Sequence, residues 1–182
     1  MGTMVVAICV CCLLLLRWVH LYWARGDGYS IQKTKDAWNY DWPASALGLL
    51  YVTALILCFL GLWKNEEIAL SRGSGALLLM AAGVALRVAG QSSLRAAFSW
   101  YWGAPESLVT TGIYKWIKHP LLIGYFLEVA SLLLASSTSS WLVATLAGLC
   151  ALLLYFQAVG EEKRLLTKFG EEWRAFARGK MA

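Results

Sequence analysis

The chain has 182 residues, of which 59% are hydrophobic and only 15% are charged, and its mean hydropathy is +0.59. A soluble domain is about 45–50% apolar and about a quarter charged, so this composition excludes an ordinary soluble domain and indicates an integral membrane protein. The net charge of +5 does not require a nucleic-acid partner, because basic residues beside membrane spans usually report topology.

Five apolar segments reach or approach the length of a transmembrane helix, which is about 17–25 residues. They cover residues 3–23, 43–63, 74–90, 120–135 and 141–158. The basic residue of the first segment, Arg17, lies near its far end, whereas a cleavable signal begins with its charge, so we expect a retained span. The third and fourth segments are the shortest and contain Arg87 and Glu128. The sequence therefore predicts an all-α, polytopic membrane helix bundle with about five transmembrane helices in one domain, residues 1–182.

Lysine and arginine are distributed unevenly between these spans. Twelve lie in segments 24–42 and 91–119 and after residue 158, against two, Lys64 and Arg72, on the opposite side. Because short cytoplasmic segments carry the excess of positive charge, the N-terminus is expected outside and the C-terminus in the cytoplasm. The polar stretch before the fourth span and the polar tail then fall on the same, cytoplasmic side.

The tail after the last span has the periodicity of a helix. Its apolar residues recur at offsets of three and four, and they are Leu165, Leu166, Phe169, Trp173, Phe176 and Ala177. Charged residues, Arg164 among them, are expected to cover the other sides. The pattern predicts a C-terminal amphipathic helix that lies on the membrane or caps the bundle.

The stretch from Leu108 to Gly124 joins a polar connection to the fourth apolar segment. Its His119-Pro120 step predicts the start of a helix, because proline at the first helical position removes no N–H that the helix needs. The free N–H groups of a first turn attract negative charge, and Lys118 and His119 come directly before them. A glycine at 124 allows a helix or a ligand to approach closely.

Arg87 and Glu128 are ionisable residues within predicted spans, where a charge is costly and faces a partner or a cavity. They either form a structural ion pair or line a polar cofactor cavity, since Glu128 lies about two turns beyond His119. We expect no metal centre, because the two histidines are far apart and no Asp or Cys has ligand spacing. Soluble nucleotide-binding motifs are also absent from the sequence.

Two motifs carry a resemblance to a known family. The stretch Gly112-Ile-Tyr114-Lys-Trp-Ile-Lys118-His119-Pro120-Leu-Leu-Ile-Gly124 resembles the G-x-Y-x-x-x-R-H-P-x-Y-x-G signature of the isoprenylcysteine carboxyl methyltransferase family, to which membrane phospholipid methyltransferases are related. The stretch Glu161 to Phe176 resembles that family's E-E-x-x-L-x-x-x-F-G-x-x-Y-x-x-Y. Together the motifs cover about the last 75 residues.

The resemblance implies a membrane methyltransferase whose cofactor is S-adenosylmethionine, bound by residues of about 108–178 on the cytoplasmic side. Its substrate is a small lipophilic molecule that enters from the bilayer, such as an isoprenylcysteine-like carboxylate. The residues implied as cofactor-binding are Tyr114, Lys118, His119, Pro120, Gly124, Glu161 and Glu162. We expect Lys118 and Glu162 to be catalytic, and Gln157, Glu128 and Arg87 to bind the substrate.

The chain departs from the family pattern at several positions. Lys118 replaces the arginine of the motif, which keeps the charge but loses the two parallel hydrogen bonds that a guanidinium can donate. Leu122 replaces a tyrosine, and the last two tyrosines of the second motif are replaced by Trp173 and Phe176. Gln157 stands where prenylcysteine enzymes carry an arginine that engages the substrate carboxylate, so the acceptor is left open. Two alternatives also remain: a nicotinamide-dependent membrane reductase, and a non-catalytic membrane protein of the same fold.

Overall fold

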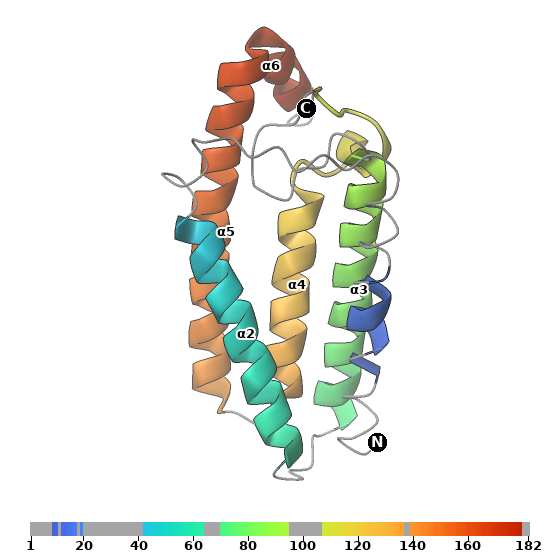
Figure 1. Ribbon diagram of the computed structural model, residues 1–182, viewed down its shortest axis with the longest axis vertical. Helices are drawn as coiled ribbons and strands as arrows, with labels where there is room; N and C mark the ends of the chain where they lie inside the picture. The colour runs from blue at the N-terminus through green and yellow to red at the C-terminus, as the bar shows by residue number, and fades with distance from the viewer. Residues whose placement is uncertain are drawn as a thin grey trace.

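The computed structural model describes residues 9–10, 12–17, 19, 42–63, 70–94, 107–136 and 139–179. All regular structure within these ranges is helical, as predicted, and residues 9–10, 12–17 and 19 belong to it (Figure 1). The elements that follow are α2 (Trp42–Trp63), α3 (Leu70–Leu94), the 3-10 helix η3 (Gly112–Lys115), α4 (Pro120–Ala135), α5 (Ser140–Phe169) and α6 (Glu171–Arg178).

The long helices run side by side along the longest axis of the molecule, and α4 is central to them (Figure 1). Helix α4 contacts α2, α3 and α5. Its side chains are accordingly buried around much of its circumference, including Leu122, Val129, Leu132 and Leu133. The hydrophobic core therefore surrounds α4, and the outward faces of α2 and α5 carry exposed Leu, Ile, Phe and Trp of the kind that faces lipid.

Three helices, α2, α3 and α5, are long and apolar enough to cross a membrane, which makes the protein an integral membrane protein. Helix α4 has 16 residues and is therefore only about 24 Å long. The second to fifth predicted segments each coincide with a helix, although α5 continues eleven residues past the predicted end at 158. Most of the first predicted segment, 3–23, lies outside the described residues, so the count of five spans stays a prediction.

Helices α3 and α4 approach each other closely at two glycines, Gly83 and Gly124. A Cβ atom on Gly124 would lie 2.7 Å from the backbone oxygen of Gly83, and one on Gly83 would lie 2.8 Å from the backbone oxygen of Gly124. Distances this short leave no room for any side chain, and small residues at such crossings let two backbones pack directly. From the sequence, Gly124 could allow either a helix or a ligand to approach closely. The structure places a helix, α3, beside it.

The tail differs from the single amphipathic helix that the sequence predicts. Helix α5 continues unbroken to Phe169, and Gly170, with φ of +53°, ends it before α6 begins. A positive φ is readily adopted only by glycine, so this residue separates the two helices. Leu165 and Trp173 of the predicted stripe are buried. Whether α6 lies on a membrane surface stays a prediction.

Candidate functional site

The connection between α3 and α4 is fixed to the end of α3 by one serine. Ser93 Oγ donates to the backbone oxygen of Ala89 at 2.8 Å and accepts from the N–H of Ile113 at 3.3 Å. Gly112, with φ of +63°, lies so close to Ser93 that a Cβ would collide with its hydroxyl. Glycine is therefore required at 112, and η3 is held where it can present Tyr114.

Lys118 and His119 lie immediately before α4, at the end of the bundle where α5 carries its two adjacent glutamates. Helix α4 begins at Pro120, as predicted, and the N–H of Ile123 donates to the backbone oxygen of His119 at 3.1 Å. The His-Pro step fixes where the helix starts, and His119 directly before it contacts α5 through its ring.

Four charged side chains meet between α4 and α5. His119 Nδ1 lies 3.2 Å from Glu161 Oε2, and His119 Nε2 lies 3.1 Å from Glu162 Oε1. Lys118 Nζ pairs with the same Glu162 oxygen at 2.9 Å. His119 is 42 and 43 positions from the two glutamates it contacts. The charged residues of the two sequence motifs nevertheless form one cluster, as expected if both motifs lie on the same side of the membrane.

The contacts define the charge state of His119. Carboxylate oxygens only accept hydrogen bonds, so an imidazole with a carboxylate at each nitrogen must donate from both and be protonated. Burial by itself lowers the pKa of His119, but the hydrogen bonds and charges of Glu161 and Glu162 outweigh it and raise the pKa above its ordinary value. With Lys118, the cluster holds two positive and two negative charges.

Two aromatic residues border this cluster. Trp173 of α6 is buried, and Lys118 Nζ lies 5.5 Å from the centre of its ring, a cation–π distance. Tyr114 of η3 is partly buried, and burial together with the charge of Glu161 raises the pKa of Tyr114. Tyr114 therefore keeps its proton and remains a hydrogen-bond donor beside Glu161.

The protonated His119 makes stability depend on pH in a defined direction. Because its pKa is raised by folding, its contribution is fully present below the unfolded value of about 6.5 and is lost as pH rises through the folded value. We expect His119→Gln to lower the thermal midpoint in detergent clearly at about pH 6 and much less at about pH 9. A difference from wild type that is the same at both pH values would contradict the assignment.

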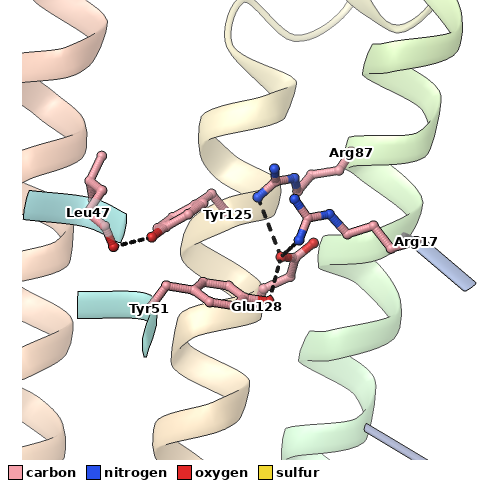
Figure 2. Close-up of polar contacts among 6 residues, drawn as sticks. All are labelled: Arg17, Leu47, Tyr51, Arg87, Tyr125 and Glu128. Carbon is pink, nitrogen blue, oxygen red and sulfur yellow. Dashed lines mark hydrogen bonds and ion pairs between the residues drawn. The ribbon is translucent and has the colours of Figure 1, made fainter. Parts of the chain in front are cut away.

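A second polar cluster lies deeper in the bundle, around Glu128. Figure 2 shows three donors converging on its Oε2 atom: Arg17 Nη1 at 3.1 Å, Tyr51 Oη at 3.2 Å and Arg87 Nη1 at 3.4 Å. They come from the N-terminal helical segment, α2 and α3, so one buried carboxylate links four parts of the fold. Along α4 the cluster is about 13 Å from His119.

Tyr125 completes the surroundings of this carboxylate. Its hydroxyl donates to the backbone oxygen of Leu47, its ring packs 5.4 Å from that of Tyr51, and the Arg87 guanidinium lies 5.4 Å from its ring centre. The pairing of Arg87 with Glu128 matches the structural ion pair that the sequence left open. Arg17 and Tyr51 were not predicted, although an arginine inside an apolar segment is itself a signal of a buried partner.

Gln157 of α5 is buried and lies close in the chain to the glutamates of the charged cluster. It is 2% exposed, its Nε2 atom has no hydrogen-bond partner, and it precedes Glu161 by one turn of α5. A buried amide donor without a partner costs free energy. Arg87 Nε and Glu128 Oε1 are also buried without a hydrogen-bond partner, but these two residues are ion-paired with each other, whereas Gln157 carries no charge.

The fold and this site together define an integral membrane protein with a charged, partly buried site at one end of a helical bundle. The model of the isoprenylcysteine carboxyl methyltransferase (ICMT) family matches residues 76–168, slightly more than half of the chain, a range that includes α4, both glutamates and most of α5. The chain belongs to this family and is thereby a membrane methyltransferase. No significant match is found among curated proteins or among solved structures.

Proposed function

We propose that the protein transfers a methyl group from S-adenosylmethionine to a small lipophilic acceptor that enters from the bilayer. The observation that carries the proposal is the contact of Lys118 and His119 with Glu161 and Glu162, which unites the two family motifs. A cluster with equal numbers of positive and negative charges is suited to the methionine part of the cofactor, which carries an ammonium and a carboxylate.

Each member of the site has a role in this proposal. Glu161 and Glu162 accept the ammonium or the ribose hydroxyls, and Lys118 and His119 hold these carboxylates in place. Trp173 offers an aromatic face for adenine or for the sulfonium. Methyl transfer is an in-line displacement, so much of the rate comes from holding the acceptor and the sulfonium in alignment. Exclusion of water within the bundle strengthens the electrostatic interactions.

The acceptor side of the site is assigned to Gln157. Its unpaired amide donor suits an oxygen of the acceptor, because a neutral amide binds an oxygen without supplying a charge. Arg87 and Glu128 serve the architecture in this proposal, since they bind each other. The distribution of Lys and Arg indicates the topology. In this proposal the site faces the cytoplasm, and the N-terminus lies on the opposite side of the membrane.

The test is calorimetric binding of S-adenosylhomocysteine to the protein purified in detergent. We expect the wild type to bind and both Glu162→Gln and His119→Ala to lose most of the affinity, about tenfold or more, because each substitution leaves a charged partner unpaired. Glu172→Gln, which removes an exposed carboxylate from α6, is the control and should bind as the wild type does. A folded wild type that binds no S-adenosylhomocysteine would overturn the proposal.

A further inference from the structure

One face of α5 carries a stripe of polar residues toward the bundle. Gln157, Glu161 and Arg164 follow one another at intervals of four and three, which places them on one side of a helix. The buried Cys150 and Leu154 belong to the same side, so the stripe faces inward. Lys163, the neighbour of Arg164 in the chain, points away and is exposed.

Arg164 differs from Lys118 and His119 because it forms no ion pair with any residue that the structure describes. Its Nε atom is buried and has no hydrogen-bond partner. Among the described residues, the cations found in ion pairs are others, namely Arg17, Arg87, Lys118, His119, Arg174 and Arg178. A buried donor without a partner costs free energy, and an anionic ligand bound at Arg164 would remove this cost.

Glu161 is the nearest carboxylate on this helix face, yet it does not neutralise Arg164. Residues three apart on a helix have Cβ atoms about 5–6 Å apart, so a Glu161–Arg164 pair is within reach. Glu161 instead contacts His119. The result is an anion and an unpaired cation held side by side, one turn apart, beside the cluster of Lys118, His119 and Glu162.

We propose that Arg164 binds the carboxylate of the methionine part of the cofactor, while Glu161 receives its ammonium. This inference rests on the proposed function. The two ligand charges are attached to the same carbon atom, so they require an acceptor and a donor that are neighbours, as Glu161 and Arg164 are. The planar guanidinium also matches a carboxylate with two parallel hydrogen bonds. Lys118 and His119 already have carboxylate partners and are left to position the glutamates.

The experiment compares two ligands on matched variants of the full chain in detergent. S-adenosylhomocysteine has the amino-acid part, and 5′-methylthioadenosine lacks it. We expect Arg164→Gln to bind S-adenosylhomocysteine about ten- to a hundredfold more weakly than the wild type, with no change for 5′-methylthioadenosine. Lys163→Gln removes the same charge from the exposed side and should leave both affinities unchanged. Arg164→Lys should recover part of the loss, since it keeps the charge but not the fork.

The outcomes separate this inference from the proposed function. Wild-type binding of S-adenosylhomocysteine that Arg164→Gln leaves intact would overturn the role of Arg164 alone. An equal loss for both ligands would also overturn it, because a general disturbance of the helix weakens the two alike. Absence of binding by the folded wild type would instead overturn the proposed function on which the inference rests.

Discussion

Glu128→Leu is expected to destabilise the protein by about 3–5 kcal/mol, the range observed when one partner of a buried ion pair is removed. Glu128 is fully buried, and its Oε2 atom accepts from both Arg17 and Arg87. The leucine leaves two guanidinium groups inside the bundle without a carboxylate, and it also removes the acceptor of the Tyr51 hydroxyl. The measurement is thermal unfolding in a mild detergent.

Two control variants make this prediction specific. Tyr51→Phe removes one donor to Glu128 but no charge, so a smaller loss of about 1–2 kcal/mol is expected. Glu172→Gln removes an exposed carboxylate from α6 and should change the stability very little. If Glu128→Leu proved no more destabilising than Tyr51→Phe, the carboxylate would not be the link between the helices that Figure 2 indicates.

The second large effect is expected at the crossing of α3 and α4. Gly124→Val should prevent the close approach of the two helices, because even its Cβ would lie 2.7 Å from the backbone oxygen of Gly83 and 2.6 Å from Arg87 Cγ. The helices must then separate or the substitution must be accommodated by strain, at a cost of about 3 kcal/mol or more. Separation also moves Arg87 away from Glu128.

Gly148→Ala is the matched control for the helix crossing. Gly148 lies in α5, and nothing lies within 4 Å of the position where its Cβ would be. Alanine is the better helix former by about 0.5–1 kcal/mol, so this variant should be as stable as the wild type or slightly more so. Thermal unfolding of both variants in the same detergent checks the pair. Equal effects of the two substitutions would contradict a close crossing at Gly124.

Much of the candidate site could be predicted from the sequence because its residues are local to two motifs. The His119-Pro120 step determines where α4 begins, since proline suits only a first turn. The adjacent Glu161 and Glu162 follow the last apolar segment directly, which places them at the end of a helix that spans the membrane. The excess of Lys and Arg then predicted one side of the membrane for both motifs, and they do lie at the same end of the bundle.

The sequence alone determined the class of protein, the all-helical fold and the start of α4 at Pro120. These features depend on composition, apolar periodicity and a single His-Pro step, all of which are local in the chain. The partners of individual charges were decided by the tertiary structure. Arg17 and Arg87 share Glu128 across 111 and 41 residues of chain, and which cation a carboxylate meets depends on how helices are rotated about their axes. The rotation of α5 about its axis also leaves Arg164 partly buried, although the sequence pattern predicted that it would lie on a charged, solvent-facing side of the helix. A single sequence contains the period of a helix but not its orientation within the bundle.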